Sequence, residues 1–104
     1  MEAPRKNRVT VRHGMLSDLK TYLTQSGWNL EDPVGKYEVL RARNLNYPRP
    51  LLVHNRSEHG IGYSIDERDM KIYSGWRRNR RKRGLSPDFP TEEENAAYWR
   101  GEIQ

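Results

Sequence analysis

The chain has 104 residues, of which 34% are hydrophobic and 32% charged, so it has room for one small domain with a modest core. It contains no cysteine, which excludes disulfides, thiol catalysis and cysteine-ligated zinc. No apolar run approaches the ~18 residues of a membrane span, and the N-terminal residues show no apolar signal segment. We therefore expect a cytoplasmic protein.

The charge is distributed unevenly along the chain. Residues 85–104 carry five acidic side chains and one basic one, or −4, while residues 1–84 carry the other 18 basic and 9 acidic ones, or +9. A basic body favours a polyanionic partner, and the acidic end could fold back onto it or bind elsewhere. The alternative is a solvated charged surface that only keeps the protein soluble.

Residues 1–14 are predicted to form a basic arm, in which Val9 and Val11 alternate with polar residues and allow a short edge strand. A first helix is predicted over residues 18–26, with Ser17 as its N-cap and Gly27 as its stop. Leucines at positions 16, 19 and 23 give this helix an apolar face, and Trp28 is expected to close the core over its end.

Three strands follow in the sequence. Residues 29–35 indicate a turn, and residues 36–43 alternate in the manner of a strand. Two prolines mark the loop over residues 44–50. Strands are then predicted over residues 51–54 and 60–65, joined by a polar hairpin loop.

A second helix is predicted to begin at Asp66 and to end at Gly84. Its first half has an apolar face with Tyr73 and Trp76, and its end reads RRNRRKR over residues 77–83. A capping box at residues 91–94 predicts a short third helix, which we expect to dock both Tyr98 and Trp99 on the body.

Together these elements predict an α+β fold with an α-β-β-β-α domain over residues 15–84, a small three-stranded antiparallel sheet packed by two helices. A basic N-terminal arm precedes it, and residues 85–104 form an acidic tail with a short helix. The expected core consists of Leu19, Leu23, Trp28, Val39 or Leu40, Leu52, Ile65, Tyr73 and Trp76.

The arginine-rich stretch is the strongest functional feature. Six like charges within two helical turns repel one another, and phosphates would relieve that repulsion. Arginine also grips phosphate through a planar fork. If all six bound phosphates, the logarithm of the binding constant would fall with log salt at a slope near −5. A solvated helix end is the alternative. The nucleic-acid-binding candidates are Arg77, Arg78, Arg80, Arg81, Lys82 and Arg83, with Arg5, Lys6 and Arg8 as a second clamp.

Tyrosines and histidines form two other groups of candidate site residues. Tyr37, Tyr63 and Tyr73 could stack on bases but fit half-buried positions better, whereas Tyr47 in its proline-bearing loop is the aromatic expected to be exposed. His54 and His59 flank Glu58, but their spacing matches no established metal-ligand motif. We therefore expect no metal, no cofactor and no catalytic residue.

Residues 19–39, with their helix, Ser26-Gly27-Trp28, acidic turn and Gly35-Lys36-Tyr37, resemble the start of HicA-type toxins. The resemblance covers about half of the chain and implies a double-stranded-RNA-binding-like fold that acts on RNA. That family has a catalytic histidine where this chain has Lys36-Tyr37, so the resemblance argues against ribonuclease activity. The strand over residues 36–43 and the PLLVHNR segment also look like small bacteriophage and prophage proteins.

The sequence thus predicts a small, basic, non-enzymatic protein that binds RNA or DNA through its arginine-rich helix end. The alternative is a phage-encoded inhibitor or assembly factor whose basic helix meets an acidic or nucleic-acid-binding protein surface.

Overall fold

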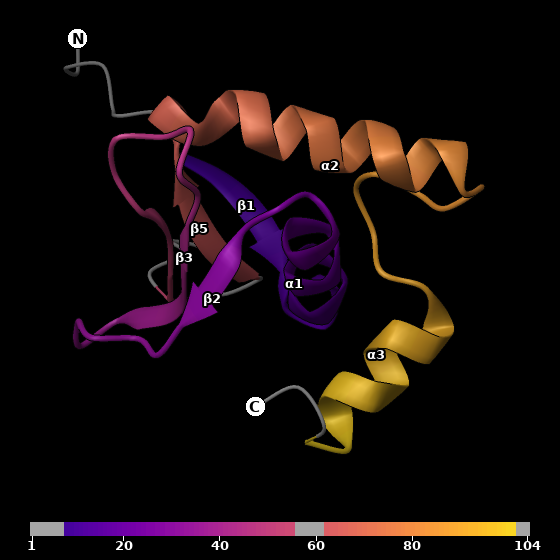
Figure 1. The fold of residues 1–104 in the computed structure, drawn as a ribbon. Coiled ribbons are helices and arrows are strands. Elements are labelled where there is room, and N and C mark those ends of the chain that lie inside the picture. Colours follow the sequence, from indigo (N-terminus) through magenta and orange to yellow (C-terminus); the bar gives the residue numbers. More distant parts are fainter. Residues whose placement is uncertain (1–7, 56–61, 102–104) are drawn as a thin grey trace, which may run out of the picture.

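A computed structural model describes residues 8–55 and 62–101. These residues form an α+β fold with a five-stranded antiparallel sheet and three α-helices (Figure 1). In chain order the elements are β1 (Arg8–Arg12), α1 (Leu16–Gln25), β2 (Asn29–Glu31), β3 (Glu38–Arg43), β4 (Leu51–His54), β5 (Gly62–Asp66), α2 (Met70–Lys82) and α3 (Glu92–Trp99). Short 3-10 helices precede α1 and α2, over His13–Met15 and Glu67–Asp69.

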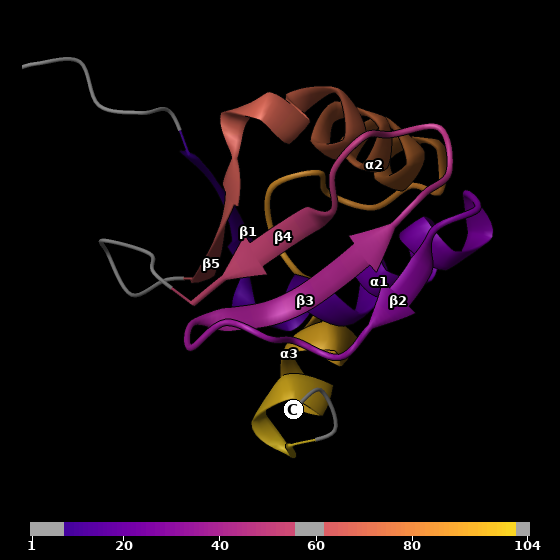
Figure 2. The ribbon, with the colours of Figure 1, turned by 60° about the vertical axis from the view of Figure 1, so that its left-hand side comes forward.

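The sheet has the strand order β1-β5-β4-β3-β2, with every neighbouring pair antiparallel. Helix α1 lies against one face of this sheet, and α2 crosses over α1 (Figure 1). Figure 2 shows β2, β3 and β4 side by side in front, with α1 and α2 behind them. The mixed α+β class is as predicted, but the prediction of three strands is wrong, because one further strand lies at each edge.

The two added strands have different origins in the sequence. β1 is the edge strand that the basic arm allows, and its five residues pair with β5, from Arg8 opposite Asp66 to Arg12 opposite Gly62. β2 lies within the predicted turn and pairs with β3. All three residues of β2 are exposed, so backbone pairing and not an apolar pattern defines this strand.

The core lies between the sheet and the two longer helices. Of the residues expected there, Leu19, Leu23, Trp28, Leu40, Ile65 and Trp76 are buried as predicted. Leu52 is only partly buried, because its neighbours Leu51 and Val53 point inward and successive strand residues face opposite sides. Tyr73 is also only partly buried.

The C-terminal ends of α1 and α2 lie where the sequence predicts them, but their N-terminal ends do not. Gly27 and Gly84 end α1 and α2 with φ of 90° and 80°, a conformation that glycine adopts readily. α1 begins at Leu16 without a capping side chain, so Ser17 is not its N-cap. Asp66 accepts a hydrogen bond from the Arg68 amide and so shapes the short turn before α2 instead of capping the helix.

Helix α3 begins with the predicted capping box, in which Thr91 and Glu94 exchange side-chain and backbone hydrogen bonds. Tyr98 packs on the body as expected, but the docking predicted for Trp99 is wrong, since its side chain is 78% exposed. The contact of Tyr98 with the body includes a stacked arrangement on His13, with ring centroids 5.2 Å apart. Across the described ranges, each helix is too short or too polar to cross a membrane.

Candidate nucleic-acid interface

Helix α2 carries the arginine-rich stretch and contains no acidic residue. Its periodicity divides the six cations of residues 77–83 between two faces. Arg77, Arg80 and Arg83 follow one another at intervals of three and form ion pairs with carboxylates of α1 and the tail. The other three are exposed and make no ion pair with a described residue. The expectation that all six cations contact phosphates together therefore does not fit the structure.

Arg80 is the most buried of the six, with a side chain 0% exposed. Its Nη1 donates to Asp18 at 2.9 Å and to Glu94 at 2.8 Å, and its Nη2 donates to Glu94 at 3.0 Å and to the Phe89 carbonyl at 3.2 Å. Its Nε donates to the Ser86 carbonyl at 2.6 Å. These five bonds match the five N–H groups of a guanidinium, so no donor remains for a phosphate.

The electrostatics of Arg80 keep it charged inside the protein. Burial by itself lowers the Arg80 pKa, but hydrogen bonds to Glu94 and Asp18 outweigh burial and raise it above its ordinary value. Arg80 is a structural ion-pair residue, and its assignment as a phosphate contact is corrected for this reason.

Asp18 joins α1 to α2 through three partners. Its carboxylate accepts hydrogen bonds from Trp76 Nε1 at 2.9 Å and from both terminal nitrogens of Arg83, at 3.0 and 2.8 Å, in addition to the bond from Arg80. Burial raises the Asp18 pKa, but the bonds from Arg83, Trp76 and Arg80 together lower it below its ordinary value. Both terminal nitrogens of Arg83 are therefore already hydrogen-bonded to the Asp18 carboxylate.

The acidic tail neutralises the rest of this inner face. Asp88 pairs with Arg77, and the Asp88 carbonyl accepts a hydrogen bond of 3.0 Å from Arg12. Glu94 serves both the capping box of α3 and the ion pair with Arg80. The sequence allows the acidic tail either to fold back onto the basic body or to bind elsewhere. In the structure it folds back onto the basic body.

The outer face of α2 has a different character. We use the term outer face for Lys71, Arg78, Arg81 and Lys82, which are all exposed. Within the described residues, none of the four makes an ion pair or a side-chain hydrogen bond. Lys71 and Lys82 are eleven positions apart, or ~16 Å along a helix, which spans about five nucleotide steps of one strand.

Lys71 was missed as a site residue because it lies outside the dense arginine run. The signal was present in the sequence, since a period of 3.6 residues places positions 71, 78 and 82 on one side of a helix. Of the other predicted contacts, Arg5 and Lys6 lie outside the described residues. Arg8 begins β1, and only its backbone pairing with Asp66 is described.

The arginines of the sheet do not form a comparable patch. Arg41 pairs with Glu38 at 3.3 Å, and Arg43 pairs with Glu31 at 3.0 Å. Each of these arginines is thus neutralised by a glutamate that precedes it in the chain.

The histidines and tyrosines divide between core and surface. Among the described residues no group of three metal-ligating side chains gathers, and His59 lies outside them. His13 lies between Tyr63 and Tyr98, and burial lowers its pKa. Burial, followed by the proximity of Tyr98, raises the pKa of Tyr63 to about 12.

Tyr47 and Tyr37 are the exposed tyrosines, at 43% and 48%. Tyr47 is stacked on Trp28, and the Lys36 ammonium lies 5.5 Å from the centroid of the Tyr37 ring. The exposure predicted for Tyr47 is confirmed.

A scan of family models and searches of curated proteins and of solved structures found no match to this chain. What the interface can bind therefore follows from its own residues: an exposed helix face of four cations, held in place by an inner face whose arginines are paired.

Proposed function

We propose that this protein binds nucleic acid without catalysis, and that the outer face of α2 contacts the phosphates. The observation that carries the proposal is the division of the arginine-rich stretch into a paired inner face and an outer face to which the described residues offer no carboxylate partner. Unneutralised cations at helical spacing repel one another, so a polyanion along this face would stabilise the helix as well as the complex.

The paired arginines support this binding indirectly. Arg80 and Arg83 hold α2 against Asp18 of α1, and Trp76 is 1% exposed beneath them. The outer cations therefore project from a helix whose orientation is set by ion pairs to Asp18 and by the buried side chains of Arg80 and Trp76. A charged surface with fixed geometry positions a phosphate backbone without reading its sequence.

The proposal is tested by titrating labelled RNA and DNA duplexes with the protein at several salt concentrations. Four phosphate contacts predict a slope of log K against log salt of about −3.6 for duplex DNA, since each contact contributes about −0.9. The Arg78→Gln, Lys82→Gln double variant should lower the magnitude of the slope by up to about 2.

The matched control is the Lys36→Gln, Arg43→Gln double variant, which removes the same charge from exposed positions away from α2. Its slope should stay close to that of the unmodified protein. Equal weakening by both double variants would contradict a specific role for α2. An absence of binding at low salt would overturn the proposal and favour the alternative, in which this face contacts an acidic protein surface.

A further inference from the structure

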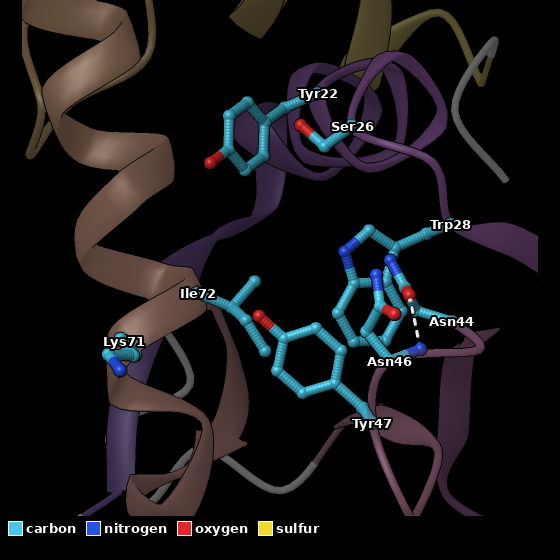
Figure 3. Close-up of a pocket in the computed structure, with 8 residues that line it drawn as sticks. All are labelled: Tyr22, Ser26, Trp28, Asn44, Asn46, Tyr47, Lys71 and Ile72. Carbon is cyan, nitrogen blue, oxygen red and sulfur yellow. Dashed lines mark hydrogen bonds between the residues drawn. The ribbon is translucent and has the colours of Figure 1, made fainter.

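A pocket of about 250 Å³ lies beside the first turn of α2, and Lys71 of the outer face is one of its lining residues (Figure 3). Three separate segments line it: the end of α1, the loop between β3 and β4, and the first turn of α2. Its volume is smaller than the ~300–1,000 Å³ typical of drug-sized ligands, so it has room for one small ring system. Its lining residues are Tyr22, Ser26, Trp28, Asn44, Asn46, Tyr47, Lys71 and Ile72.

One wall of the pocket is aromatic. The Tyr47 ring stacks on the Trp28 ring with centroids 4.9 Å apart and an interplanar angle of 25°. Trp28 is 6% exposed, and Tyr47 is 43% exposed, so the buried indole supports an accessible phenol ring. A supported aromatic ring of this kind is a stacking surface for a planar base.

Polar groups without partners line the same space. The side-chain oxygen of Asn44 accepts a hydrogen bond of 2.8 Å from the backbone N–H of Asn46, which fixes the turn of the loop (Figure 3). Among the residues that the structure describes, the side chain of Asn46, the Tyr22 hydroxyl and Trp28 Nε1 make no hydrogen bond. An amide can match a donor-acceptor edge, and an indole N–H can only donate, so together they fit a base that presents an acceptor.

Gly75 of α2 leaves room for the side chain of Tyr22, which lines the pocket. A Cβ atom at this position would lie 2.7 Å from the Tyr22 hydroxyl, which is closer than two such atoms approach in proteins. Glycine therefore lets the hydroxyl end of Tyr22 lie against the helix, although glycine is unfavourable within helices.

Lys71 connects the pocket to the proposed phosphate-binding surface. It lines the pocket, and it is also the first cation of the outer face of α2. A nucleotide with its base in the pocket would have its phosphate within reach of this ammonium group, and the strand could continue along Arg78 and Lys82.

We propose that the pocket binds a single unpaired nucleobase of the nucleic acid whose phosphates contact the outer face of α2. This inference rests on the proposed function and adds a preference to it. The protein should favour a strand with a bulged or terminal unpaired nucleotide over a perfect duplex of the same length.

The test compares a perfect RNA duplex with the same duplex carrying one bulged nucleotide. We expect about tenfold tighter binding of the bulged duplex. The Asn46→Ala and Tyr47→Ala variants should lose that preference while they retain the salt-dependent binding of the perfect duplex. Tyr37→Ala, which removes an equally exposed tyrosine outside the pocket, should keep the preference.

A second measurement reads the pocket directly and does not depend on a variant that folds. The indole N–H resonance of Trp28 should shift when uridine or guanosine monophosphate is added, and should not shift with ribose 5-phosphate at the same concentration. Equal binding of the two duplexes together with an unmoved Trp28 resonance would overturn the pocket proposal and leave the proposed function standing. Loss of all duplex binding at low salt would instead overturn the proposed function.

Discussion

The guanidinium of Arg80 donates a hydrogen bond of 2.9 Å to the carboxylate of Asp18, across 62 positions of the sequence. Glu94 binds the same guanidinium from α3, so one buried cation joins all three helices. This arrangement reverses the role that the sequence suggests for the centre of the arginine-rich stretch. Arg80 stabilises the fold, and its neighbours Arg78 and Arg81 remain accessible to a ligand.

Replacing Arg80 by Met should destabilise the protein by about 3–5 kcal/mol, because Glu94, which is only 19% exposed, loses its cation and Asp18 loses one of its two cations. The free energy of unfolding, measured in urea, tests this value. Arg81→Met is the matched control, since it removes the same group from an exposed position and should change stability by less than about 0.5 kcal/mol. Similar stabilities for the two variants would contradict the buried ion-pair assignment.

Local signals predicted much of the fold. The spacing of Leu16, Leu19 and Leu23 gave the buried face of α1, and the capping box gave the start of α3. Which face of β4 points toward the core was harder to predict. The alternation along β4 allows either Leu52 or its two neighbours to face the core, and only the pairing with β3 decides between them.

The candidate site was predicted only as a region. The sequence located the cations of α2, but the carboxylates that pair with three of them lie at positions 18, 88 and 94. Such pairs depend on tertiary contacts and leave no local pattern. The pocket was missed for the same reason, since its walls come from three separate segments.

Trp76→Ala should cost about 3–5 kcal/mol of stability, since it removes a large buried side chain and leaves a cavity. Trp76 is 1% exposed and also donates a hydrogen bond to Asp18. Trp99→Ala is the control, because Trp99 is 78% exposed and should contribute little. Thermal denaturation of both variants measures the difference, and a Trp76→Ala protein that melts within a degree or two of the unmodified one would refute the packing.

His13 should make the protein less stable as the pH falls below the ordinary histidine pKa of 6.5. Burial lowers its pKa in the folded state below the ordinary value of 6.5, so the unfolded state binds the proton more strongly. The stabilisation is complete above pH 6.5 and is lost as the pH falls toward the lowered folded pKa. The melting temperature should fall over this range, and His13→Phe should reduce the fall. An identical pH profile for the two proteins would exclude His13 as its source.

Gly62→Ala should disrupt the pairing of β1 with β5. A Cβ atom at position 62 would lie 2.3 Å from the Val11 carbonyl oxygen, which belongs to the backbone of the facing strand and has no rotamer by which to move away. Hydrogen exchange of the β1 amides should therefore accelerate in this variant. Gly84→Ala is the control, since Gly84 has a positive φ but no atom within 4 Å of the added Cβ. This substitution should strain the backbone only at the end of α2 and leave the exchange of the β1 amides unchanged. Unchanged β1 protection in Gly62→Ala would contradict the close approach.

Asp88→Asn should strengthen nucleic-acid binding and steepen its salt dependence. The change removes the charge that neutralises Arg77, whose side chain is 27% exposed and whose only ion pair among the described residues is with Asp88. The backbone bonds of Asp88 to Arg12 and Ser86 do not depend on the carboxylate, so the loop should keep its path. One further phosphate contact would add up to about 0.9 to the magnitude of the slope.

The control is Glu93→Gln, which removes the same charge from an exposed position in α3. Because salt screens charges that are more than ~10 Å apart at 0.1 M, the slope of this variant should match that of the unmodified protein. Anisotropy titrations at three or more salt concentrations compare the variants. If the Asp88→Asn and Glu93→Gln variants have equal slopes, the tail acts only through its overall charge. The ion pair with Asp88 then does not prevent Arg77 from contacting the ligand.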